Sequence, residues 1–132
     1  MPNPFENSRA AVFLTERLRD LKHRKTQKEV AREAGFLNAN MLSLLKSGAN
    51  KVPLDRVPAL AKALEADPAY LMRLSLEQSV GVTAANAIVE VFGTPVSENE
   101  RGWLEEIRDA SDHSDPRLTT RSRVALRGIF GR

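Results

Sequence analysis

The chain contains no cysteine, which excludes disulfide bonds and thiolate metal sites and is typical of a reducing cytoplasm. It has two histidines, His23 and His113, and neither has a companion at the spacing that metal ligands need. No apolar run approaches the roughly 18–20 residues that span a bilayer. The opening MPNPFENSRA also lacks the basic and then apolar order of a signal peptide. These absences predict a cytoplasmic protein without a metal, a cofactor or a membrane partner.

Signals for β-structure are missing as well. The sequence has no pair of alternating apolar runs and no Asn-Gly hairpin turn. Apolar residues recur instead at helical spacing, which predicts helices over about residues 6–25, 27–34, 38–46, 54–65, 68–77, 83–92, 97–110 and 118–130. The expected fold class is therefore all-α, and 132 residues suffice for one ordinary domain or a small domain with an appendage.

Charge is sorted into three blocks along the chain. Residues 1–73 hold 13 Lys and Arg against 8 Asp and Glu, or +5, and residues 77–116 hold two Arg against nine acids, or −7. Residues 117–132 hold five Arg and no acid, or +5. Blocks of this kind indicate parts with different partners. We therefore expect a first domain over 1–77 and a second, helical region over 78–132.

Two short predicted helices with a tight turn between them lie at residues 27–48. Thr26 and Glu29 have the spacing of a capping box at the start of the first helix, and Gly35 ends that helix. Asn38 is a good cap for the second helix, which stops at Gly48. This order of elements is that of a helix-turn-helix, which docks its second helix in the major groove of DNA.

The side chains of this segment have the chemistry that DNA contacts need. Gln27 lies in the first turn of its helix, where its amide and free backbone N–H groups can hold a phosphate oxygen. Residues 38–41, with the sequence NANM, combine Asn, which pairs with adenine, and Ala or Met, which touches a thymine methyl. Three further residues follow where a loop can lie along the DNA backbone: Lys46, Asn50 and Lys51.

The same residues also have plainer interpretations. Gln27 and Asn38 can serve only as helix caps, and Asn40, Lys46 and Lys51 can be ordinary surface residues. Ser43 has no His and Asp partners at a recognisable spacing, so the sequence does not predict an enzyme. The basic residues of the first helix are expected to form a solvated face: Arg17, Arg19, Lys22, Arg24 and Lys25.

The stretch from Leu18 to Leu71 resembles the DNA-binding domain of the phage Cro/C1-type (XRE) family of helix-turn-helix regulators. The resemblance rests on LRDL at 18–21, TQKEVAREAG at 26–35, LSLLKSG at 42–48, VPALAKAL at 57–64 and DPAYL at 67–71. It implies a five-helix, lambda-repressor-like domain whose second and third helices bind double-stranded DNA. It also implies a homodimer on a palindromic operator, and a phosphate contact by Gln27.

The chain departs from the family pattern at two places. Gly35 and Gly48 are thirteen residues apart, one more than is typical of the family, so one extra residue lies in the turn. Counting back from Gly48 gives the residues expected to face the groove: Ala39, Asn40, Ser43 and Leu44. Lys46 replaces an acidic residue common in the family, which removes an ion pair and adds a possible phosphate contact.

The function expected from these patterns is sequence-specific transcription regulation. Residues 78–132 are expected to dimerise the protein, because their apolar segments include Trp103 and because a dimer doubles the DNA contacts. The alternative is an antitoxin or anti-repressor whose residues 78–132 bind a protein partner. The five arginines of 117–132 have three interpretations: a second DNA contact, a partner of the acidic block, or a frayed tail.

Overall fold

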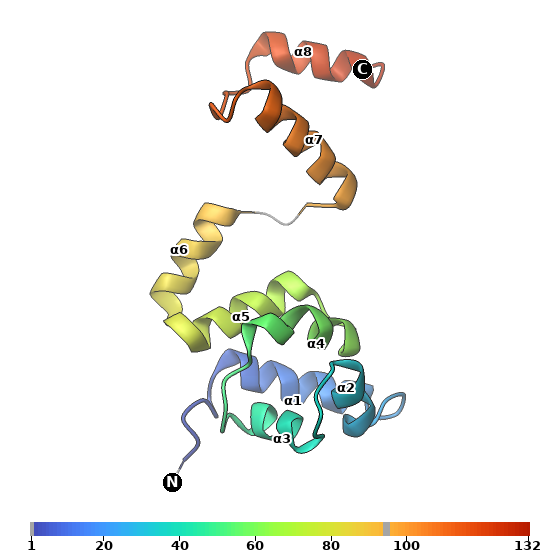
Figure 1. Cartoon of the computed structure of the whole chain (residues 1–132), viewed down its shortest axis with the longest axis vertical. Helices are drawn as coiled ribbons and strands as arrows, with labels where there is room; N and C mark the ends of the chain where they lie inside the picture. The colour runs from blue at the N-terminus through green and yellow to red at the C-terminus, as the bar shows by residue number, and fades with distance from the viewer. Residues whose placement is uncertain (1, 94–95) are drawn as a thin grey trace. The chain divides into compact units, whose positions relative to one another are not determined.

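The computed structural model describes residues 2–93 and 96–132, and every regular element within them is helical (Figure 1). The all-α prediction is therefore confirmed for this part of the chain. A 3₁₀ turn, η1, covers Leu54–Arg56. The α-helices are α1 (Arg9–Leu21), α2 (Gln27–Glu33), α3 (Asn40–Ser47), α4 (Val57–Ala63), α5 (Pro68–Val80), α6 (Val82–Phe92), α7 (Glu98–Ala110) and α8 (Thr120–Ile129). None of these described helices is both long and apolar enough to cross a membrane.

One hydrophobic core holds α1 to α5 together. Figure 1 shows α1 between α3 and α5, and α4 packs on both α2 and α5. Each helix contributes side chains spaced three or four residues apart, which is the spacing that puts them on one helix face. The largest buried side chains are Leu14, Leu21, Val30, Leu42, Leu45, Val52, Val57, Leu60, Leu64, Leu71 and Leu74.

Two pairs of residues in the sequence have the spacing of a capping box, Thr26 with Glu29 and Ser97 with Glu100, and the structure gives them different outcomes. The Thr26 hydroxyl accepts the Glu29 backbone N–H at 3.1 Å, but the Glu29 carboxylate accepts from that hydroxyl and not from the Thr26 N–H. The box at the start of α7 is complete, because Ser97 and Glu100 each accept the other's backbone N–H. Both signals therefore locate a helix start, and only one gives the full reciprocal pattern.

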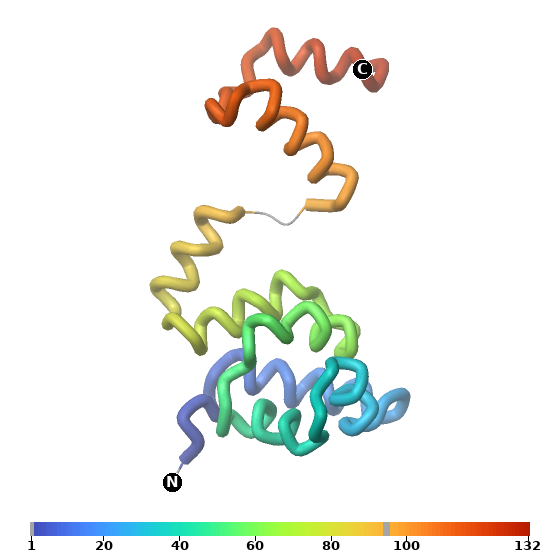
Figure 2. Tube along the Cα trace, in the orientation of Figure 1, coloured from blue at the N-terminus to red at the C-terminus, as the bar shows by residue number. Residues whose placement is uncertain are grey.

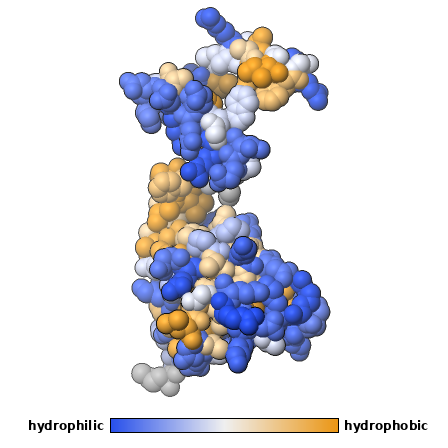
Figure 3. Space-filling model, turned by 45° about the vertical axis from the view of Figure 1, so that its right-hand side comes forward, coloured by the Kyte–Doolittle hydropathy of each residue, from blue (hydrophilic) through white to orange (hydrophobic). Residues whose placement is uncertain are grey.

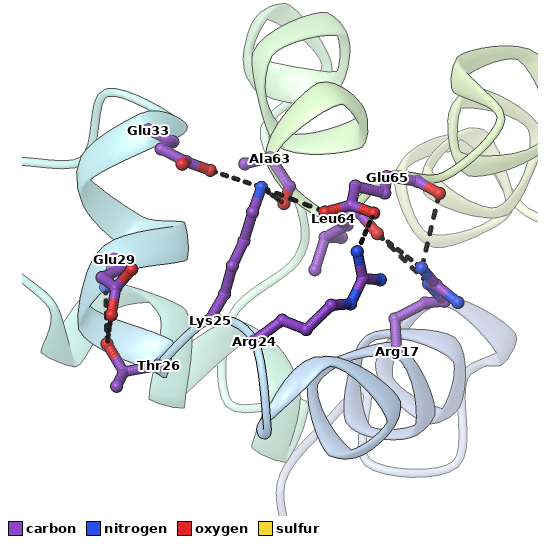
Figure 4. A network of polar contacts seen from close by, with 9 residues as sticks. All are labelled: Arg17, Arg24, Lys25, Thr26, Glu29, Glu33, Ala63, Leu64 and Glu65. Carbon is purple, nitrogen blue, oxygen red and sulfur yellow. Dashed lines mark hydrogen bonds and ion pairs between the residues drawn. The ribbon is translucent and has the colours of Figure 1, made fainter.

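The basic end of α1 differs from the solvated face that the sequence predicts (Figure 4). Arg17 and Lys25 are half-buried, and both donate to carbonyl groups at the end of α4. Arg17 Nη2 lies 2.9 Å from Leu64 O, and Lys25 Nζ lies 2.9 Å from Ala63 O. The last carbonyls of a helix lack intrahelical partners and carry partial negative charge, so these two cations satisfy them.

A second set of contacts extends this network. Lys25 Nζ pairs with Glu33 of α2 at 2.7 Å, and Arg24 pairs with Glu65 at 2.9 Å. The contact with Glu33 raises the pKa of Lys25, and the contact with Arg24 lowers the pKa of Glu65. These residues join the end of α1 to α2 and to the end of α4, so they have a structural role: they hold these helices in place.

Contacts divide the chain into two compact units, one before and one after residues 94–95. The division lies one helix later than the boundary that the sequence predicts at 77–78. The reason is that α6 packs on α5, with Ala85 fully buried and Asn86 near Arg73. The second unit contains α7 and α8, and none of its side chains over residues 96–132 is buried.

Candidate nucleic-acid interface

Helix α3 is fixed to the core by one face and exposes the other. Leu42 and Leu45 are fully buried, whereas Asn40 is exposed and Ser43 and Leu44 are half-buried. At 100° per residue, Asn40, Ser43 and Leu44 lie on the side of the helix opposite the two buried leucines. Counting back from Gly48 along the sequence predicts that these same three residues face outward. The outward face of α3 is therefore polar at its start and contains no acidic residue.

The start of α3 shows how Asn38 and Ala39 are used. Asn38 Oδ1 accepts the Asn40 backbone N–H at 2.9 Å, and Asn38 O accepts from Met41 at 3.1 Å. Ala39 is half-buried and packs against the core. The helix begins at Asn40, two residues later than predicted, because Asn38 forms a side-chain turn before it. In this conformation Asn38 closes a side-chain turn just before α3, and Ala39, the N-cap residue, packs against the core. The exposed side chain at the start of α3 is Asn40.

A polar cluster connects the first turn of α2 to the outward side of α3. Gln27 Nε2 donates to Ser43 Oγ, and Lys46 Nζ lies 3.2 Å from Gln27 Oε1. All three side chains are half-buried, so each keeps some surface in contact with solvent. The structure thus brings together three residues that the sequence analysis named one by one as candidate DNA contacts. It also fixes the orientation of the Gln27 amide by contacts at both of its ends.

The loop after α3 presents Asn50 and Lys51, both exposed, at the edge of this face. Its backbone is held at Val52, whose N–H donates to Gln78 Oε1 at 2.8 Å. Gln78 Nε2 in turn donates to Ser8 Oγ at 2.9 Å, at the start of α1. One side chain of α5 therefore ties the loop to the first helix.

The N-terminal segment supports the end of α3. Phe5 N–H donates to Gly48 O at 2.8 Å, and Asn3 Nδ2 donates to Ser47 O at 3.2 Å. Figure 2 shows this segment (blue) beside the chain that leaves α3. Sequence reasoning missed these contacts and that of Gln78, because contacts between distant segments leave no local pattern.

Two exposed residues, one before α3 and one at its end, were also missed. Leu37 is completely exposed in the turn before α3, at 106% of its reference surface. Ser47 is exposed, and its position in the helix places it on the same face as Asn40. A signal for Ser47 was present, since it lies seven residues after Asn40, but the predicted helix ended at about residue 46.

No protein-family model, no curated protein and no solved structure matches this chain. The site is therefore defined by its own residues and their geometry alone.

Proposed function

We propose that the protein is a DNA-binding transcription regulator and not an enzyme, and that α2 and α3 form a helix-turn-helix within a five-helix, lambda-repressor-like domain. The observation that carries this proposal is the cluster of Gln27, Ser43 and Lys46. It links the start of α2 to the outward side of α3, which has a free Asn40 and no acid. A helix that enters the major groove needs such a face, held rigidly against a neighbour that contacts phosphate.

The proposed roles follow from exposure and charge. Asn40 and Ser43 read base edges from the first turns of α3, with Leu44 beside them for apolar contact. Gln27, Lys46, Asn50 and Lys51 contact phosphates and set the register of α3 in the groove. Asn38 and Ala39 shape the start of α3, as their contacts indicate. Because much of the affinity would come from phosphates, binding is expected to weaken steeply with salt.

The test begins with a pool of random duplex DNA, from which the full chain selects its best site. Fluorescence anisotropy then measures affinity for that site and for an unrelated duplex. Asn40→Ala is expected to cost about 1–3 kcal/mol on the selected site and little on the unrelated one. Lys51→Ala is expected to weaken binding to both duplexes and to reduce the salt slope by about one.

Lys62→Ala is the matched control, because Lys62 is exposed on α4 and makes no side-chain ion pair among the described residues. Its affinity is expected to equal that of the unchanged chain. If no duplex binds at low salt, the DNA-binding proposal fails. The function would then be protein interaction, as in an antitoxin or anti-repressor, which the exposed apolar residues of 78–132 favour.

A further inference from the structure

The second unit has a groove between its two helices in the place of a core. Residues 96–132 contain α7 and α8, and no side chain among them is buried. The groove has a volume of about 730 Å³, within the range of about 300–1,000 Å³ that is typical of small-molecule sites. Figure 3 shows apolar side chains (orange) on this unit. A ligand in the groove would supply apolar contacts that the two helices lack.

The lining of the groove changes from polar to apolar along its length. Its polar residues all lie in the loop that joins the helices or in the helix turn next to it: Arg108, Ser111, His113, Asp115, Arg117 and Ser122. Farther from the loop the lining is apolar on both helices: Leu104, Ile107, Ala125, Leu126 and Ile129. At this far end the helices meet through Trp103 and Phe130, whose ring centroids are 5.7 Å apart. The groove therefore has one polar end and one apolar end.

The polar end carries an excess of one positive charge. Its charged lining residues are two arginines and one aspartate, which gives +2 and −1, or +1. Neither Arg108 nor Arg117 forms an ion pair with any residue in 2–93 or 96–132. A guanidinium binds an acid group through paired N–H donors, and arginine is therefore common where acids are recognised. The polar end thus fits one acid group of single negative charge.

The extent of the lining sets the length of chain that the groove accommodates. The lining residues of the two sides extend over 104–111 and 122–129, or about 10 Å at a rise of about 1.5 Å per residue. An extended alkyl chain advances about 1.3 Å per carbon, given a C–C bond of about 1.5 Å. The groove therefore accommodates about eight carbon atoms in a row.

The apolar surface of the groove is small for a protein partner. Four large apolar side chains line it and are between 42% and 65% exposed: Ile107, Leu118, Leu126 and Ile129. At on the order of 100 Å² of apolar surface for each whole side chain, they offer about 200 Å². A stable protein interface buries about 800 Å² on each partner, so the area suits a small molecule better.

We infer that this groove binds an amphipathic acid, with one negative charge and an unbranched chain of about eight carbons. The acid group lies against Arg108 and Arg117, and the chain extends between α7 and α8 toward Trp103. This class of ligand matches the charge, the polarity and the length of the lining together. The inference goes beyond the proposed function, since it involves no residue of α2 or α3.

The first experiment titrates the full chain with octanoate at concentrations below those that form micelles. Trp103 is the only tryptophan and lies at the apolar end of the groove, so its emission reports on the bound chain. The emission is expected to shift to shorter wavelength and to saturate. Octanol and octylammonium have the same chain without the negative charge. Each is expected to bind at least about tenfold more weakly, because hydrogen bonds from the arginines to a charged group are lost. Equal binding of all three would overturn the inference.

Chain length tests whether the groove sets the size of the ligand. A fully buried methylene adds about fourfold in affinity, and the lining side chains are about half exposed, so each added carbon is expected to add about twofold. Affinity is then expected to rise about sixteenfold from butanoate to octanoate. From decanoate to dodecanoate it is expected to change less than about twofold, because the added carbons extend beyond the groove. A rise that continues at the same rate to dodecanoate would overturn the inference.

Two pairs of arginine substitutions locate the acid group. Arg108→Gln with Arg117→Gln is expected to lower octanoate affinity about tenfold and to leave octanol affinity unchanged, which also shows that the groove is intact. Arg121→Gln with Arg123→Gln is the matched control, because these two residues of α8 do not line the groove. It is expected to bind octanoate as the unchanged chain does. An equal loss in both variants would overturn the inference, since it would show a general attraction to positive charge.

The same ligand chemistry also occurs at a lipid surface, so vesicles of an anionic phospholipid form a separate arm. Binding to vesicles without saturable binding of free octanoate would overturn the inference in favour of a membrane surface. No saturable change in Trp103 emission up to millimolar octanoate would overturn it as well, and sedimentation equilibrium would then show whether a second copy covers the groove. None of these measurements involves DNA, so the inference and the proposed function fail separately.

Discussion

Gly48 is the residue where one added methyl group is expected to have a large effect. It ends α3 in the left-handed region, with φ at +79°, and its carbonyl accepts the Phe5 N–H. A Cβ built on Gly48 would lie 2.3 Å from the carbonyl carbon of Phe5 and from the backbone nitrogen of Glu6. Backbone atoms cannot approach so closely, so Gly48→Ala must displace the N-terminal segment.

The expected loss of stability has two parts. The left-handed conformation costs a residue with a Cβ about 1–2 kcal/mol. Displacement of the segment also breaks the hydrogen bonds from Phe5 to Gly48 and from Asn3 to Ser47, at about 1 kcal/mol each. Together these effects lower the free energy of unfolding by about 3–4 kcal/mol. A domain stable by about 5–15 kcal/mol remains folded after such a loss.

Gly35 provides a matched control on the same motif. Its φ is +82°, but the one atom of the described residues within 4 Å of an added Cβ is Arg56 Nη1 at 3.0 Å. This atom is the end of a flexible and exposed side chain that donates to Gly35 O, so it can shift at little cost. Gly35→Ala therefore carries the conformational cost alone, about 1–2 kcal/mol. The two substitutions are therefore expected to differ by about 2 kcal/mol in their effect on the free energy of unfolding, and this difference measures the contact between Gly48 and the N-terminal segment.

Urea unfolding followed by circular dichroism measures both variants in the full chain and in a chain that lacks residues 2–6. In the shortened chain the cost of Gly48→Ala is expected to fall to that of Gly35→Ala, because the clashing backbone is gone. Equal costs of the two substitutions in the full chain would refute the reasoning. So would a cost of Gly48→Ala that the deletion leaves unchanged.

Two further predictions concern the polar contacts that hold the first unit together. Gln78→Leu removes the acceptor of the Val52 N–H and is expected to lower the free energy of unfolding by about 1–3 kcal/mol in urea unfolding, because that donor loses its partner. The contact with Arg24 lowers the pKa of Glu65 in the folded state, so the folded protein binds fewer protons there than the unfolded chain. The contribution of this ion pair to the free energy of unfolding is fully present above the pKa that Glu65 has in the unfolded chain. It is lost as the pH falls through the pKa of Glu65 in the folded protein. The stability difference between the unchanged chain and Glu65→Gln is therefore expected to shrink between about pH 5 and pH 3, and a difference that stays constant there would contradict this account.

The helices and their ends could be predicted from the sequence because their causes are local. Apolar spacing places Leu42 and Leu45 on one side of α3, and burial of both confirms that side. The hydroxyls of Thr26 and Ser97 each accept a backbone N–H three residues on, so both helix starts are where the sequence places them. The start of α3 was predicted two residues early, since an Asn can cap a helix directly or form a turn just before it.

The supports of the candidate site could not be predicted, because they join segments far apart in the sequence. Gln78 contacts residues 26 and 70 positions away, and Phe5 contacts a residue 43 positions away. Nothing in the local composition distinguishes such a Gln from a surface residue. The same limit explains why the sequence predicts solvent exposure for Arg17 and Lys25. Their partners are carbonyl groups at the end of α4, which only the fold brings beside them.

Lys46 has two effects on the Gln27 amide, one through a hydrogen bond and one through its charge. Its ammonium carries three hydrogens, of which one points to Gln27 Oε1 at 3.2 Å. That contact, with the one from Gln27 Nε2 to Ser43, leaves the amide one orientation in which both ends have partners. The other two hydrogens of Lys46 and the second Nε2 hydrogen of Gln27 have no partner among residues 2–93 and 96–132. Under the proposed function, Lys46 therefore orients the phosphate-binding amide and also adds a positive charge beside it, which an acidic residue at the same position would oppose.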